Sequence, residues 1–97
     1  MSLEQRSGKV TFLRVHDVGT KYGPSTDQID VEAVIQLNNN SDPSVGFQLR
    51  NDTNRVAHQG MLDLLRDAFN HGWTTTVDYE IESGKKNGVM IRVWLTK

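Results

Sequence analysis

The sequence predicts a single, mainly β domain of five strands with one α-helix between the third and fourth strands. Three observations lead to this prediction. Apolar and polar residues alternate strictly from Gln28 to Leu37, as in a strand with one buried face. Apolar residues then recur at helical spacing between Ala57 and His71. The alternation returns after Gly72, so the order of elements is three strands, one helix and two strands.

The composition limits the classes of protein to which this chain can belong. Its 97 residues suffice for one small core, and without cysteine it has no disulfide, thiolate zinc site or cysteine nucleophile. The 11 basic and 12 acidic residues are mixed along the chain, whereas a committed nucleic-acid binder is usually more basic. No apolar run approaches the roughly 18 to 20 residues that span a bilayer. We therefore expect a soluble protein without membrane insertion, and its polar start favours a cytoplasmic location.

The first three strands are separated by segments rich in turn residues. In the first strand, residues 9–18, the apolar positions change parity between Phe12 and Leu13, which indicates a β-bulge. Residues 19–26 form a loop, and the polar segment 38–43 forms another. The second strand is expected to turn these residues toward the core: Ile29, Val31, Ala33, Ile35 and Leu37. The third is expected to turn inward Val45, Phe47 and Leu49.

In the second half of the chain, the spacing of apolar residues changes from the alternation of a strand to the period of a helix and then back to alternation. Gly72 occupies the position where a left-handed residue ends a helix. Residues 74–82 form the fourth strand, and residues 83–88 form a hairpin connection. In the fifth strand the expected core residues are Val89, Ile91, Val93 and Leu95. Residues 1–8 are expected to be a flexible N-terminal segment, and residues 9–97 to be the single domain.

Strands with one apolar face and one amphipathic helix can bury their apolar residues in two ways: as an open α+β sheet covered by the helix, or as a barrel closed at one end by the helix. A barrel leaves fewer exposed edges, so it is the predicted arrangement. The order of elements and the coiled first strand resemble the oligonucleotide/oligosaccharide-binding (OB) fold over Lys9–Leu95. Within that fold, the Met61–Gly72 helix running into a threonine-rich strand is similar to the B subunits of AB5 toxins, whose barrels form rings. Those subunits commonly carry a cysteine pair that this chain lacks.

The outer face of the fifth strand is the first candidate for a binding surface. It carries Met90, Arg92 and Trp94, and Val34 faces outward from the second strand. Tryptophan, methionine and arginine are enriched at protein interfaces. We therefore expect this surface to form a homo-oligomer or to bind a protein partner. The alternative is that Trp94 packs beneath a loop or the N-terminal segment.

Two loops form the second candidate, because the resemblance places them on the binding side of the fold. The first loop carries Lys21 and Tyr22, the last carries Lys85 and Lys86, and Arg50 precedes the helix. Together they could stack a base or a sugar and hold a phosphate. However, Asp30 and Glu32 on the second strand would repel a phosphate backbone, whereas a glycan tolerates them. Alternatively, the lysines form a solvated hairpin tip and Arg50 pairs with nearby acids.

The sequence contains no phosphate-binding glycine loop, nucleophile elbow or histidine–glutamate zinc motif. His16 beside Asp17 is the one candidate corner of an acid–base site, and His58 and His71 lack metal-ligand spacing. We therefore expect no cofactor, no metal and no enzymatic activity. The sequence predicts a binding or assembly module; the alternative is a single-stranded nucleic-acid-binding domain that uses the lysine and tyrosine loops.

Overall fold

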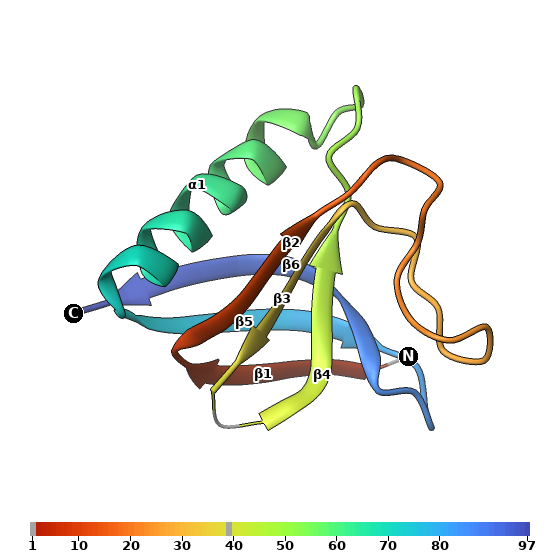
Figure 1. Ribbon diagram of the computed structural model, residues 1–97, viewed down its shortest axis with the longest axis horizontal. Coiled ribbons are helices and arrows are strands. Elements are labelled where there is room, and N and C mark those ends of the chain that lie inside the picture. The colour runs from red at the N-terminus through yellow and green to blue at the C-terminus, as the bar shows by residue number, and fades with distance from the viewer. Residues whose placement is uncertain (1, 39) are drawn as a thin grey trace.

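A computed structural model describes residues 2–38 and 40–97 and shows a mainly β chain with one helix (Figure 1). Its elements, in chain order, are β1 (Ser2–Gly8), β2 (Val10–Val15), β3 (Ala33–Leu37), β4 (Asn40–Phe47), α1 (Arg55–His71), β5 (Thr74–Ile81) and β6 (Asn87–Thr96). The predicted loop 38–43 is shorter than expected because β4 already begins at Asn40. Asn39 lies outside the described residues.

The strands form one six-stranded mixed sheet in the order β1-β5-β6-β4-β3-β2. All neighbours are antiparallel except β4 and β6, which run parallel where Ser44–Gly46 pair with Asn87–Val89. The sheet is not closed, so the predicted five-stranded barrel is not confirmed. The expected first strand is replaced by two, because β1 pairs with β5 at one edge and β2 pairs with β3 at the other. Only Lys9 separates these two edge strands in the chain.

Of the N-terminal residues 1–8 that were expected to be flexible, Ser2–Gly8 form β1, and Met1 lies outside the described residues. This strand pairs with β5 along its whole length, from Ser2 opposite Ile81 to Gly8 opposite Thr75. Polar contacts support the pairing, since Gln5 Nε2 donates to Asp78 Oδ1 at 2.8 Å. Nearly all side chains of β1 are exposed, so the strand has no apolar alternation from which the sequence could predict it.

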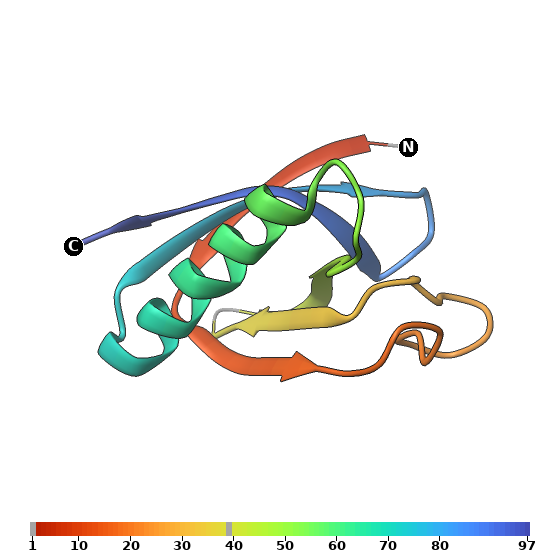
Figure 2. The same cartoon turned by 90° about the horizontal axis from the view of Figure 1, so that it is seen from above.

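The sheet is strongly curved, so that β1, β5 and β6 face β2 and β3 across the molecule, with α1 between them at one end (Figure 2). The helix buries Met61, Leu65 and Ala68 in this space. Around them lies the main core, made of Val10, Ala33, Ile35, Leu37, Val45, Phe47, Val77, Tyr79 and Met90. Gly72 ends the helix as predicted, with a left-handed φ of 68° and an N–H that donates to the Ala68 carbonyl at 2.8 Å.

A second, smaller cluster lies on the outer side of β3 and consists of Ile29, Val31 and Val34 with Phe12 and Tyr22 packed against them. The predicted strand 28–37 is regular only from Ala33, because the chain bends at Glu32. Ile29 and Val31 therefore cover the outer side of β3 instead of entering the main core. This corrects the placement of Val34, which is fully buried and belongs to no binding surface.

A β-bulge at Ile91 corrects the predicted register of the last strand. Asp78 pairs with Arg92, whereas the next residue, Tyr79, pairs with Met90, so Ile91 is the extra residue. Up to the bulge, the inner and outer faces of β6 are the reverse of the predicted ones: Met90 is buried in the main core, and Val89 and Ile91 are exposed. Beyond it the prediction is right, since Val93 and Leu95 pack on the core and Trp94 faces outward.

Candidate functional site

The long loop between β2 and β3, residues 16–32, is fastened to the hairpin between β5 and β6, and Asp27 is the point of attachment. Its carboxylate accepts the backbone N–H of Lys86 at 2.6 Å and that of Asn87 at 3.3 Å. Its carbonyl accepts from Asn87 Nδ2 at 2.9 Å, and Lys85 Nζ donates to the Thr26 carbonyl. These bonds hold together two segments that are about sixty residues apart in sequence.

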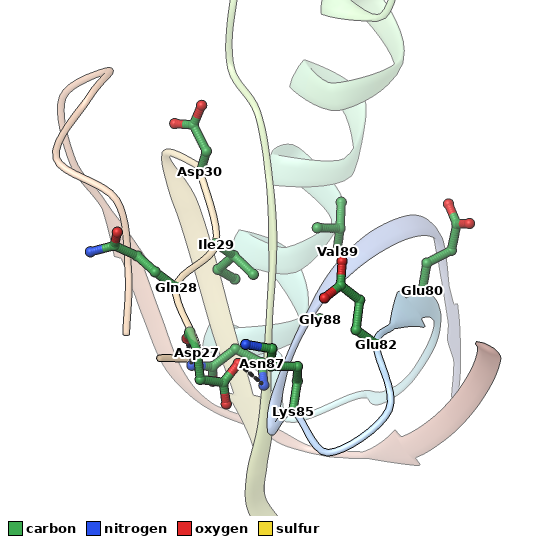
Figure 3. A pocket seen from close by; sticks show the side chains of 10 residues that line it. All are labelled: Asp27, Gln28, Ile29, Asp30, Glu80, Glu82, Lys85, Asn87, Gly88 and Val89. Carbon is green, nitrogen blue, oxygen red and sulfur yellow. Dashed lines mark hydrogen bonds between the residues drawn. The ribbon is translucent and has the colours of Figure 1, made fainter. Parts of the chain in front are cut away.

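A cleft of about 400 Å³ lies between these two segments (Figure 3). We call it the loop cleft; its lining residues are Asp27, Gln28, Ile29, Asp30, Glu80, Glu82, Lys85, Asn87, Gly88 and Val89. Asp30 stands on one side, Glu80 and Glu82 stand on the other, and Ile29 and Val89 lie between them. With four carboxylates and one ammonium group, the lining is negatively charged at neutral pH.

A second hollow, also of about 400 Å³, adjoins the loop cleft where Asp30 and Val89 border both. It extends along β6 past Ile91 to Asn54 and His58 at the start of α1. Val89 and Ile91 are exposed here because of the β6 bulge. The bulge therefore supplies the apolar surface between the acidic loop cleft and the polar end of α1.

Arg50, expected to bind an anion, is held by two carboxylates. Its Nη2 lies 2.9 Å from Glu32 Oε2 and 2.5 Å from Asp30 Oδ1, and its Nε donates to Glu32 Oε1 at 3.1 Å. Hydrogen bonds to Glu32, which have the larger effect, and to Asp30 raise the pKa of Arg50 above its ordinary value. Glu32 is buried and also accepts the Leu49 N–H, so the arginine compensates a buried charge. The alternative interpretation of Arg50, pairing with nearby acids, describes its place in the structure.

Tyr22 and Lys21 lie outside the loop cleft. The Tyr22 ring packs on the second cluster, and its hydroxyl lies 3.3 Å from both Ser44 Oγ and Gln36 Nε2. Lys21 is exposed in the same loop with a left-handed φ of 64°. Tyr22 is partly buried and fastens the loop to the sheet, with Arg14 Cζ 5.8 Å from the centre of its ring.

The two hairpin lysines lie differently from each other. Lys85 lines the loop cleft. Lys86 gives its backbone N–H to Asp27 and borders a separate hollow with Glu4, Arg6 and Tyr79. The structure thus brings only one of the five ligand-loop candidates into the cleft. The four carboxylates of the loop cleft were not predicted as one group, because no pattern in the sequence indicates that Asp27 lies near Glu80 and Glu82.

The expected surface of Val34, Met90, Arg92 and Trp94 is reduced to its last two members. Arg92 Nε lies 3.3 Å from Asp78 Oδ2, and Trp94, which is 39% exposed, stands opposite Thr76. Leu3, Val89 and Ile91 are exposed on the same side of β1 and β6. We call this surface of Leu3, Asp78, Val89, Ile91, Arg92 and Trp94 the outer sheet face.

Each of the three histidines bonds to a backbone carbonyl. His16 Nε2 lies 2.7 Å from the Val31 oxygen, His58 Nδ1 lies 2.5 Å from that of Gln48, and His71 Nδ1 lies 2.9 Å from that of Asp67. His16 Nδ1 is buried without a partner among the described residues. In that part of the chain, no three side chains of His, Asp or Glu are grouped to hold a metal ion.

Within residues 2–38 and 40–97, no helix has both the length and the apolar character needed to cross a membrane. Comparisons of the chain with protein-family models, with curated proteins and with solved structures gave no match. The functional assignment therefore depends on the geometry of the loop cleft and of the outer sheet face.

Proposed function

We propose that the protein is a non-enzymatic binding module that holds a hydroxyl-rich, uncharged or cationic ligand, typified by a glycan, in the loop cleft. The observation that carries this proposal is a cleft of four carboxylates and one lysine between two loops that Asp27 fastens together. Because the loops are already joined, a ligand meets a preformed site and little ordering is needed on binding.

The lining suits hydroxyl groups better than phosphates. Carboxylate oxygens accept hydrogen bonds from hydroxyls, and the Lys85 ammonium and the Asn87 amide can donate to them. Ile29 and Val89 offer apolar contact to the C–H side of a sugar ring. A phosphate in the same cleft would face four carboxylates, of which Asp30 is paired with Arg50, and the lining offers one ammonium group, that of Lys85.

We also propose that the sheet is an OB-like barrel that lacks full closure. Three observations support this: β1 and β2 at the two edges are consecutive in the chain, β4 and β6 are parallel, and α1 lies between β4 and β5 in sequence. The loop cleft then lies between the first and last loops of the barrel, where OB folds bind oligosaccharides and oligonucleotides. This support is fold-level analogy, and the ligand chemistry is argued from the cleft itself.

Protein binding through the outer sheet face is a second candidate function. Leu3 on β1 and Ile91 and Trp94 on β6, the two strands that flank β5, are exposed there on one side of the sheet, around the Arg92–Asp78 ion pair. The single-stranded nucleic-acid alternative has weaker support, since Arg50 is paired with Glu32 and Asp30 and Tyr22 is packed on the second cluster. The bond of each histidine to a backbone carbonyl supports a structural role for these side chains.

The test is a binding screen on immobilised glycans and on labelled single-stranded oligonucleotides, with the wild type and two charge-reversal variants. Glu82→Lys changes the loop cleft, and Asp67→Lys is its matched control at an exposed position of α1. We expect glycan binding that weakens at least about tenfold in Glu82→Lys and is kept in Asp67→Lys. Salt-dependent oligonucleotide binding without glycan binding would instead favour the nucleic-acid alternative.

A further inference from the structure

We infer that two copies of this chain associate through β1, whose outer edges pair antiparallel about a two-fold axis that lies midway between the two copies of Gln5. The inference concerns a surface outside the loop cleft and does not depend on the ligand proposed there.

The edge at β1 has the features of a strand that accepts a partner. It is the outermost strand on its side of the sheet and pairs with β5 alone among the described strands. Its seven residues contain no proline, and their register with β5 has no bulge. Prolines and bulges are two of the means by which natural sheets block an edge, and the unpaired N–H and C=O groups of a regular edge without them can pair with another chain. The charged side chains of β1, which are a further means of protection, then restrict the partner to one that matches their charges.

The opposite edge is different. β2 has a register shift between Val10 and Phe12, and α1 packs beside it. A bulge and a covering helix are two of the means by which edges are blocked. The two edges therefore differ in their capacity to pair, and β1 is the open one.

The charges of β1 select one register for pairing with a second copy. In a two-fold antiparallel pair, directly opposite residues share a face, so one residue must stand opposite its own copy, and we say that the axis lies at that residue. An axis at Glu4 sets Glu4 against Glu4, and an axis at Arg6 sets Arg6 against Arg6. An axis at Gln5 sets Glu4 of each copy against Arg6 of the other, which gives two attractive pairs. Both side chains are exposed in the single chain.

Such an interface is isologous, because the same strand contributes to both sides and the contact closes at a dimer. It also joins the two sheets into one continuous sheet across the copies. The sequence-based expectation of a homo-oligomer is thereby moved from the outer sheet face to the edge at β1. The expected interface is small, so association should depend on protein concentration in the accessible range.

The experiment is sedimentation equilibrium over roughly 10 µM to 1 mM protein. The wild type is compared with Arg6→Glu, with Glu4→Arg, with an equimolar mixture of these two variants, and with Trp94→Asp as a control on the outer sheet face. Circular dichroism shows that each variant is folded.

We expect a wild-type dimer, and dimerisation about tenfold weaker or more in each β1 variant alone, because like charges then face each other. In the mixture, the acidic side chains of the Arg6→Glu variant face the arginines of the Glu4→Arg variant, so a heterodimer should form. Trp94→Asp should stay dimeric. A wild-type monomer throughout the range would overturn the inference, as would a dimer that Trp94→Asp dissociates and the β1 variants leave intact. Glycan binding by a monomeric wild type would leave the loop cleft proposal standing.

Discussion

Among single residues, there are a few positions where the structure leaves little choice of side chain. Gly46 lies beneath Val31, and a Cβ there would fall 2.5 Å from Val31 Cγ2 and 2.7 Å from the Ala33 carbonyl. At Gly60 in α1, no atom other than the neighbouring backbone of the helix lies within 4 Å of the corresponding point. Close packing therefore requires a glycine at Gly46, where Val31 covers β4, and does not require one at Gly60.

This contrast predicts opposite effects of the same substitution. Gly46→Ala should lower the free energy of unfolding by about 1–3 kcal/mol, because the added methyl group must displace Val31 or the backbone. Gly60→Ala should raise it by up to about 1 kcal/mol, because alanine favours a helix and the position is open. Urea unfolding of both variants measures the two changes. A Gly46→Ala variant as stable as the wild type would show that Val31 does not pack there.

The buried end of the Arg50–Glu32 ion pair is a second place where the structure leaves little choice of side chain. Arg50→Met should destabilise the protein more than Arg66→Met, because it leaves the buried Glu32 carboxylate unpaired, whereas Arg66 and Asp63 are both exposed. The pKa of Arg50 is raised in the folded protein. The ion pair therefore stabilises the fold fully at every pH below the ordinary arginine pKa, and this stabilisation is lost only as the pH rises through the raised pKa. Arg50 itself therefore adds no pH dependence near neutrality. Equal urea midpoints for the two variants would contradict this assignment.

Among the helices and strands, periodicity predicted the helix and the inner residues of most strands. The spacing from Ala57 to His71 and the stop at Gly72 match α1 closely, because an amphipathic helix with a glycine end is specified locally. The change of parity between Phe12 and Leu13 also indicated a bulge in the first strand, and the structure has a register shift slightly earlier, between Val10 and Phe12. The bulge at Ile91 was missed because both faces of β6 are apolar there, so alternation could not show which face is inward.

The corrected register of β6 predicts the cost of two truncations. Met90→Ala should lower the free energy of unfolding by about 2–5 kcal/mol, since Met90 is 1% exposed within the main core. Ile91→Ala, at the exposed bulge residue, should cost less than about 1 kcal/mol. Thermal and urea unfolding of both variants will decide between the registers. If Ile91→Ala were the costlier change, the original alternation would be right and the bulge wrong.

For the molecule as a whole, the resemblance indicated that the first and last loops meet, and the structure places them together through Asp27. What the loops hold between them could not be predicted, because Asp27, Glu80 and Glu82 meet only through the fold. β1 was not predicted for a related reason: it forms by pairing with β5, and its side chains carry no apolar pattern. Long-range pairing thus creates both the edge proposed for dimerisation and the cleft proposed for binding.

The most direct test of the loop cleft is amide chemical-shift mapping of the protein during titration with the glycan that binds best in the screen. We expect saturable shifts centred on Ile29, Asn87 and Val89, and their loss in Glu82→Lys but not in Asp67→Lys. Shifts centred on the outer sheet face around Trp94, or no saturable shift with any glycan, would contradict binding in the loop cleft.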